Sequence, residues 1–564
     1  MSFRRFKQMV FLLSSKVVVA LVLFVGGTGA RPECDGVCEG LKCEETPGSC
    51  DVVEATLGCK CREREELLAM IDGHRRRLTS SNETSVEECR LDESDCLLRS
   101  LGENTKISTK TAETGCIFGD DFAFQVFRRQ ESLKRLAVVF RGGSPLTSDV
   151  GIASALVTGD DGATAVTPFI IDEEFIGGLY YSNENFTENV FQEFDTLVSV
   201  PQCSGDLNVG NGTAEYFGGL LSIDHLGGAN VQAVLEWLVN QHEIIEEIVV
   251  VGISGGASPA TIWTPIFLER LRPQTATIVS DSSPSILTGT CPSLLLYGSV
   301  LARVGACDIL ATEDLREKCF VDESVDVGEV VKAALDALGP EGLFLEISSK
   351  ADTWNRDKLT LAGIAALEII DDVSPQCSLS DVFFFETEEA YYSQLVSFVD
   401  DIMALNNATN YITYILDTDV HPKLDTFSAN GALGPVVRVP NPFSPHDNLT
   451  APIFLDSTFD IIEPDPLAIN APSLDGSLSF EPSLARWLKT AILSRTATHQ
   501  CYGLPVDDFQ GHIHTCPKAL DGLSYDAARI CESTTDCPPA MTCYFPPPIA
   551  TAGGNPGRCR RQAL

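Results

Sequence analysis

Positive charge is scarce in this sequence, and the shortage limits the partners that the protein can bind. Its 40 lysines and arginines stand against 79 aspartates and glutamates, which gives a formal net charge of −39. Such an excess argues against nucleic acid and anionic membranes as partners. It also disfavours a polyanionic substrate at long range, unless local basic groups or salt offset the repulsion.

Long apolar runs are scarce as well, and the one clear run lies in residues 1–30. Arg4, Arg5 and Lys7 precede the apolar segment 17–27, and small residues follow at 28–30. This order is typical of a secretory signal peptide, although a retained anchor is the alternative interpretation. The run is short for a membrane span, and no later segment approaches about eighteen continuous apolar residues. We therefore expect a secreted, extracellular protein with no association with the membrane after cleavage.

Cysteine, by contrast, is abundant. The 20 cysteines form an even set, with eight between Cys34 and Cys96 and four between Cys531 and Cys559. In an exported chain such clusters indicate disulfides, and zinc is the competing interpretation of the "CDGVC" and "CKC" spacings. We expect a cysteine-rich N-terminal region at 31–112, a cysteine-rich C-terminal tail at 519–564, and no metal or other cofactor. Five Asn-x-Ser/Thr sequons suit a glycoprotein: Asn82, Asn185, Asn211, Asn407 and Asn448.

Between these ends, apolar runs alternate with helical periodicity. Runs at 122–129, 135–143, 247–252, 275–281 and 410–419 are typical of strands, and residues 230–241 have the apolar spacing of a helix. The alternation predicts an α/β domain over 113–518, with a mostly parallel central sheet flanked by helices. Functional residues are expected at the carboxyl ends of its strands.

A glycine-rich turn follows the run 247–252. In "VVVGISGGASP" (249–259), Ser254 occupies the centre of a Gly-x-Ser-x-Gly motif directly after a predicted strand. Such a tight turn from strand to helix exposes a serine hydroxyl and directs the following amide, here of Gly255, toward an oxyanion. The motif predicts a nucleophilic serine, and a serine in an ordinary glycine-rich loop is the alternative.

A nucleophilic serine needs a base and an acid, which in this topology follow it in the order acid, then histidine. Only eight histidines are present, and five follow the motif: His421, His446, His499, His512 and His514. His512 and His514 lie on a loop beside Cys516 after a glycine, which makes either one a candidate base. For the acid, Asp417 and Asp419 follow the apolar run 411–416, and either can orient an imidazole.

The second oxyanion donor is expected after an earlier strand. Gly142 and Gly143 follow the apolar run 136–140 after one residue, Arg141, so their backbone can approach an ester oxygen. An ordinary glycine turn is the alternative interpretation.

Several stretches together resemble the pectin acetylesterases and Notum-type carboxylesterases. "CIFGDDFAFQVFRR" with "LAVVFRGG" resembles the family's opening, "VPQCSGDLNVGN" its Pro-Tyr-Cys-Thr-Gly-Asp segment, "DHLGGANVQAVLEWL" the helix that follows, and "VVVGISGGASP" its elbow. "TYILDTDVH" is similar to the strand with the catalytic acid and "GHIHTC" to the segment with the catalytic histidine. The resemblance thus favours Asp419 over Asp417 and His514 over His512. Ser144 and Pro145 stand where the family has a third glycine and Cys-Trp.

The resemblance implies a secreted serine carboxylesterase that removes O-acetyl groups from a cell-wall or extracellular polysaccharide such as pectin. Its catalytic residues would be Ser254, Asp419 and His514, with Gly142, Gly143 and Gly255 at the oxyanion. Apart from the resemblance, Cys501 and Cys516 bracket the histidine loop, and a disulfide between them would position the base, although sequence alone does not set the connectivity. The alternatives are a lipid-acyl deacylase, a catalytically silent binding protein on the same fold, and a serine peptidase.

Overall fold

The computed structural model describes residues 86–109, 113–117, 119–143, 145–147, 152, 190–216, 221–283, 297–350, 352, 355, 388–406, 410–416, 438–439, 451–452, 484–495, 499–501, 530–531, 541–544 and 557–561. All structural statements below concern these residues.

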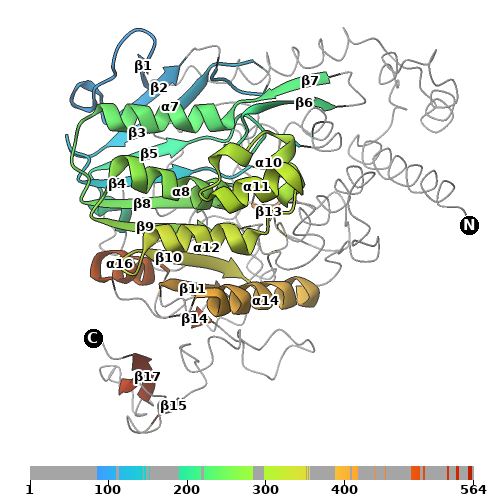
Figure 1. Cartoon of the computed structure of the whole chain (residues 1–564). Coiled ribbons are helices and arrows are strands. Elements are labelled where there is room, and N and C mark those ends of the chain that lie inside the picture. Colours follow the sequence, from blue (N-terminus) through green and yellow to red (C-terminus); the bar gives the residue numbers. More distant parts are fainter. Residues whose placement is uncertain are drawn as a thin grey trace, which may run out of the picture.

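A ten-stranded sheet forms the centre of the protein, with the strand order β1-β2-β3-β5-β4-β8-β9-β10-β11-β14 (Figure 1). Its strands are β1 (Glu87–Arg90), β2 (Asn104–Thr109), β3 (Phe122–Arg128), β4 (Arg135–Phe140), β5 (Thr196–Val200), β8 (Glu247–Ile253), β9 (Thr275–Asp281), β10 (Leu343–Ser349), β11 (Tyr411–Leu416) and β14 (Gln500–Cys501).

Most of this sheet is parallel. Every neighbouring pair from β5 to β14 runs parallel, whereas β3 runs antiparallel to both β2 and β5. The central strands are continuous apolar runs because both of their faces are covered, as the buried residues of β8 and β9 illustrate. The prediction of a mostly parallel α/β sheet is confirmed.

Helices cover both faces of the sheet. Buried side chains of α7 (Gly227–Asn240), α8 (Ala257–Leu271), α12 (Val327–Leu338) and α14 (Glu388–Asn406) belong to one apolar cluster, on one face. Those of α16 (Leu484–Ser494) and of the 3-10 turn η3 (Val190–Glu193) belong to a second cluster, on the opposite face. Figure 1 shows α7, α8 and α12 side by side across the first face.

Smaller elements complete the described fold. They are the hairpin of β6 (Gly212–Tyr216) and β7 (Leu221–His225), the helices α10 (Ser299–Arg303) and α11 (Glu313–Val321), the 3-10 turns η1 (Leu98–Ser100), η5 (Ser254–Gly256) and η7 (Cys307–Ile309), and the antiparallel pair β12 (Arg438–Val439) and β13 (Ala451–Pro452). In the C-terminal tail, β15 (Ile530–Cys531), β17 (Gly557–Arg561) and β16 (Met541–Tyr544) form a three-stranded antiparallel sheet.

The sheet begins earlier in the chain than the expected boundary at residue 112. Strand β2 pairs with β3 along its whole length, and β1 pairs with β2. Ile107 and Leu101 are buried in the apolar cluster of α7, and the indole Nε1 of Trp237 donates to the carbonyl oxygen of Cys96 at 2.9 Å. Residues 86–109 are therefore integrated with the α/β domain, because β2 covers the outer edge of β3.

Three disulfides join described residues: Cys89–Cys96, Cys116–Cys203 and Cys307–Cys319. They support the expectation of an exported chain, because disulfides persist in oxidising compartments. The expected Cys501–Cys516 bridge involves Cys516, which lies outside the described residues. Within the described part of the chain, none of the helices has the length and apolar character needed to cross a membrane.

Candidate active site

Ser254 lies at the sharp turn between β8 and α8. Strand β8 ends at Ile253, the 3-10 turn η5 spans Ser254–Gly256, and α8 begins at Ala257. The backbone of Ser254 has a φ of 53°, in the left-handed region that residues with a side chain rarely adopt. Strained backbone of this kind concentrates at functional sites, and a serine in this conformation after a parallel strand is the geometry of a nucleophile elbow.

The glycines around Ser254 are required by close packing. A Cβ atom on Gly252 would lie 2.4 Å from the Cα atom of Ala257, and one on Gly256 would lie 2.3 Å from the carbonyl oxygen of Phe140. Both distances are shorter than any real contact, so the chain can turn here only where side chains are missing. This explains why the motif has glycine at both positions.

The loop after β4 lies against this turn. A Cβ atom on Gly142 would lie 3.1 Å from the Cβ atom of Ser254, and one on Gly255 would lie 2.1 Å from the carbonyl oxygen of Gly143. The structure therefore brings together Ser254, Gly255, Gly142 and Gly143, which lie in separate segments of the sequence and are predicted to form one site. Ser254 is half-buried, and backbone amides beside a serine hydroxyl are the arrangement that stabilises the oxyanion of a tetrahedral intermediate.

Two buried carboxylates lie at the carboxyl ends of the next strands. Asp281 ends β9, where it pairs in register with Ile253 of β8, and it accepts a hydrogen bond from the Ser282 hydroxyl at 2.7 Å. Asp352 follows β10 and is fully buried; its carboxylate accepts from the backbone nitrogen of Asn355 at 2.9 Å. Both acids lie on the same edge of the sheet as Ser254.

The loops that hold these acids are tied to each other. The side-chain amide of Asn355 donates to the carbonyl oxygens of Ser282 at 3.0 Å and Ser283 at 3.2 Å, and the Ser282 amide donates to the carbonyl oxygen of Ile347 at 2.8 Å. Sequence reasoning missed Asp352 because Glu346 and the serines that follow it break the apolar pattern of β10. The signal that was available is the apolar start of this strand, "LFLEI" at 343–347.

Most of the other predicted site residues lie outside the part of the chain that the structure describes. Asp417, Asp419, His512 and His514 lie outside the described residues, as do His421 and His446. His499 lies between α16 and β14, and its Nδ1 accepts from the backbone nitrogen of Thr413 at 3.2 Å, within the sheet. This bond holds the buried His499 side chain against β11.

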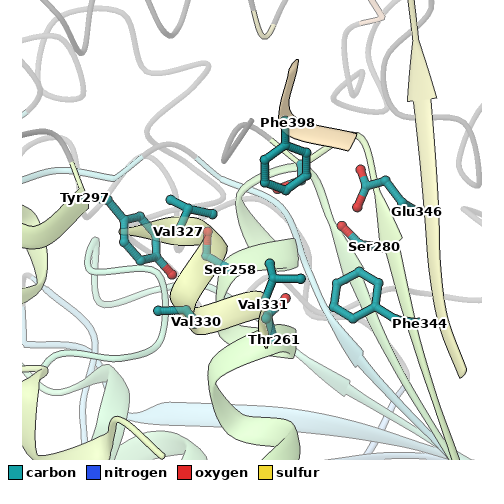
Figure 2. A pocket seen from close by; sticks show the side chains of 11 residues that line it. Ser258, Thr261, Ser280, Tyr297, Val327, Val330, Val331, Phe344, Glu346 and Phe398 are labelled. Atoms are coloured by element: carbon teal, nitrogen blue, oxygen red, sulfur yellow. The ribbon is translucent and has the colours of Figure 1, made fainter. Parts of the chain in front are cut away.

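A small cavity lies between the helices of the first face and strands β9 and β10 (Figure 2). Its volume is about 10 Å³, which is room for one water molecule. Figure 2 shows Tyr297 and Ser258 across the cavity from Ser280 and Glu346. Burial raises the pKa of the Tyr297 phenol, although its hydrogen bond with the Ser258 side chain opposes that shift. Ser258 lies one helical turn after Ser254, so this cavity adjoins the helix that follows the turn.

Within the described ranges, no group of three histidine, cysteine, aspartate or glutamate side chains is arranged to hold a metal ion.

Among the comparisons with known proteins, only the one with solved structures gives a match. No protein-family model matches the chain, and no curated protein matches it. Among solved structures, the chain is similar to the Wnt deacylase Notum from Drosophila, with 15% sequence identity and a TM-score of 0.37. That match covers 57% of this chain and 87% of the other.

Proposed function

We propose that this protein is a secreted serine carboxylesterase with Ser254 as its nucleophile. The observation that carries the proposal is the φ of 53° at Ser254, at the end of a central parallel strand and against Gly142. A strained backbone persists only where the surrounding structure enforces it, and here three close approaches of backbone to glycine do so.

In the proposed reaction, a late histidine takes the proton of the Ser254 hydroxyl, and the serine oxygen attacks the ester carbonyl. The amide of Gly255 and that of Gly142 or Gly143 stabilise the oxyanion. The imidazolium then protonates the leaving alcohol, and water releases the acyl group by the reverse sequence of proton transfers. The resemblance in sequence favours His514 as this base.

Two aspartates are candidates for the acid that orients the imidazole. The sequence favours Asp419, whereas the fold offers Asp352, a buried carboxylate after β10. Strand β10 is two strands from β8, so their ends are separated by about 10 Å. An imidazole with a hydrogen bond on either side can bridge a separation of that order. With Asp352 as the acid, His421, which follows β11, becomes a candidate base beside His514.

The proposed substrate is a short O-acyl ester, such as an O-acetyl group on an extracellular or cell-wall glycan. The resemblance of the sequence to the pectin acetylesterases supports acetyl over a lipid-acyl group. The net charge of −39 favours a neutral or weakly charged glycan over a polyanionic galacturonan.

The direct test is hydrolysis of acyl esters by the secreted, purified protein, with chain lengths from acetyl to palmitoyl. We expect the highest kcat/KM on acetyl and loss of at least a thousandfold in Ser254→Ala. Ser299→Ala is the matched control, because the Ser299 hydroxyl is buried in α10 and has no hydrogen-bond partner among the described residues. Preference for long chains contradicts the acetyl assignment and favours a lipid deacylase. Equal activity of Ser254→Ala and the wild type contradicts the esterase proposal and favours a binding protein.

The same assay assigns the base and the acid. We expect His514→Ala to abolish turnover, and the variants His421→Ala and His512→Ala test the two alternatives. Asp352→Asn and Asp419→Asn separate the candidate acids, since the loss of the orienting carboxylate lowers kcat by about 10⁴ in enzymes of this mechanism. The acid is the residue whose replacement has the larger effect on kcat.

A further inference from the structure

The loop between β5 and β6 is buried and strained beside the candidate active site. Residues 203–210 are all buried. Gly205, Leu207 and Asn208 have φ values of 67°, 58° and 56°. Two consecutive left-handed residues with side chains are costly, so other contacts must hold this loop in place.

The Asp206 carboxylate supplies those contacts. It is fully buried and accepts hydrogen bonds from the Ser204 hydroxyl at 2.6 Å, the Asn208 amide at 2.9 Å and the Gly227 amide at 2.8 Å. The Gly227 amide is the first of α7, where an anion is favoured by the unpaired N–H groups of the helix. Asp206 thus joins the strained loop to a rigid helix through charge-assisted bonds.

The loop held in this way contacts the turn at Gly255 and the segment that follows Gly143. The Cδ2 atom of Leu207 lies 3.3 Å from the point where a Cβ atom on Gly255 would be, while Gly143 closes the other side. The Leu146 amide, three residues after Gly143, donates to the carbonyl oxygen of Gly205 at 2.7 Å.

A second bond fixes the loop to the helix that follows the nucleophile. The indole Nε1 of Trp263 in α8 donates to the carbonyl oxygen of Asn208 at 2.9 Å. Leu207 is therefore held at its C-terminal side by α8 and at its N-terminal side by Asp206.

We propose that Asp206 and Leu207 are positioning residues for the Gly255 amide. They act through the loop rather than by contact with substrate, and this inference rests on the proposed esterase function. An oxyanion donor stabilises the transition state only if its direction is fixed before the reaction, because reorientation during the reaction costs part of the gain. A looser Gly255 peptide should then lower kcat while substrate binding is kept.

The test compares Leu207→Ala and Asp206→Asn with Leu335→Ala. Leu335 is buried in α12, so its truncation removes the same side chain from the core away from this loop. We expect a fall in kcat of about tenfold to a hundredfold for both loop variants, with KM within about twofold of the wild type. Binding of a phosphonate or boronate that imitates the oxyanion should weaken by the same factor. Leu207→Met, which conserves volume, should restore most of the kcat.

Two results would overturn the inference. One is an unchanged kcat in Leu207→Ala, with a loss of thermal stability equal to that of Leu335→Ala. The other is an increase in KM without a fall in kcat, which would make Leu207 a substrate contact. If Asp206→Asn is not secreted, the two Leu207 variants decide between these outcomes. A failure of the proposed function is recognised separately, because the wild type and Ser254→Ala would then have the same activity. In that case the inference about Asp206 and Leu207 fails as well.

Discussion

Gly142 lies directly against Ser254. A side-chain carbon on Gly142 would come within 3.1 Å of the Ser254 Cβ atom and within 2.9 Å of the carbonyl oxygen of Ile253. The loop after β4 and the turn after β8 are therefore fitted to each other without space for a methyl group. Any side chain at residue 142 must separate the proposed oxyanion donors from the nucleophile.

The first prediction concerns this contact. Gly142→Ala should lower kcat by about a hundredfold, because a displacement of about 1 Å at an active site can have an effect of that size. The measurement is steady-state hydrolysis of an acetyl ester. Gly115→Ala is the control, since a Cβ atom there would make only ordinary contacts, at 3.4 Å and 3.6 Å. An equal kcat for both variants would contradict the assignment of Gly142 to the site.

The second prediction is a pH dependence of stability from His225. Its Nδ1 donates to the carbonyl oxygen of Ser204 at 3.2 Å, so its Nε2 accepts from the Tyr216 hydroxyl at 2.6 Å. Burial lowers the pKa of His225 below its usual 6.5, and the nearby Asp206 and Asp224 carboxylates only partly oppose this shift, while Arg303 adds to it.

Because the pKa is lowered in the folded state, the unfolded chain binds more protons as the pH falls below 6.5. The stability from neutral His225 is present above pH 6.5 and is lost as the pH falls toward the lowered value. The slope from this group is at most about 1.4 kcal/mol per pH unit. Denaturant unfolding of the wild type and His225→Gln at pH 7.5 and 5 measures it. We expect a shallower pH dependence in the variant; equal slopes would contradict the prediction.

The third prediction compares two buried tyrosines. The Tyr411 hydroxyl is fully buried and has no hydrogen-bond partner among the described residues, whereas the Tyr216 hydroxyl is bonded to His225. Burial raises the pKa of Tyr411 well above 10, and the Glu346 charge adds to that shift. Tyr411→Phe should leave the free energy of unfolding unchanged or raise it by up to about 1 kcal/mol. Tyr216→Phe should lower it by about 1–2 kcal/mol. A larger loss of unfolding free energy in Tyr411→Phe than in Tyr216→Phe would show that the Tyr411 hydroxyl has a hydrogen-bond partner in the folded protein.

The fourth prediction concerns two disulfides of different span. Cys116–Cys203 joins residues 87 positions apart, and Cys307–Cys319 joins residues 12 apart. In the chain-entropy description, their removal costs about 4.5 and 3 kcal/mol respectively. Replacement of each pair by alanines, followed by thermal unfolding, should show the larger loss for the first pair. Only the replacement of Cys116 and Cys203 should also lower kcat, because Cys203 begins the loop that contains Leu207.

Much of the fold follows from the pattern of apolar residues. The runs that form β4, β8, β9 and β11 are recognisable because central parallel strands are apolar on both faces, and the antiparallel strand β3 is recognisable because most of it is buried. Strand β10 is harder to recognise, because Glu346 is buried in its middle and a buried carboxylate breaks the apolar pattern. Strands β1 and β2 are also missed, since the surrounding cysteines and charged residues suggest a separate region. Their place in the sheet depends on pairing with β3, which a local pattern does not contain.

The candidate site is predicted in part for the same reason. Ser254, Gly255, Gly142 and Gly143 lie in short motifs with strong local constraints, so the sequence identifies them and the fold brings them together. Asp352 has no such motif, and its burial results from contacts of its loop with Ser282 and Ser283 through Asn355. The proposed positioning role of Leu207 could not be predicted from the sequence either, because it depends on the short distance between the Leu207 side chain and Gly255 in the fold.

The strand order affects how this protein folds while it is being synthesised on the ribosome. Strand β4 lies between β5 and β8. During synthesis β5 can pair with one edge of β4 first, and the other edge stays unpaired until β8 has been made. An apolar strand with an open edge promotes association between nascent chains. The cysteines at 116 and 203 are both synthesised before β8, so oxidation of that pair can hold the early strands together during the interval. Rapid oxidation should thus protect the nascent chain from aggregation, and a delay in it should reduce the yield of folded protein.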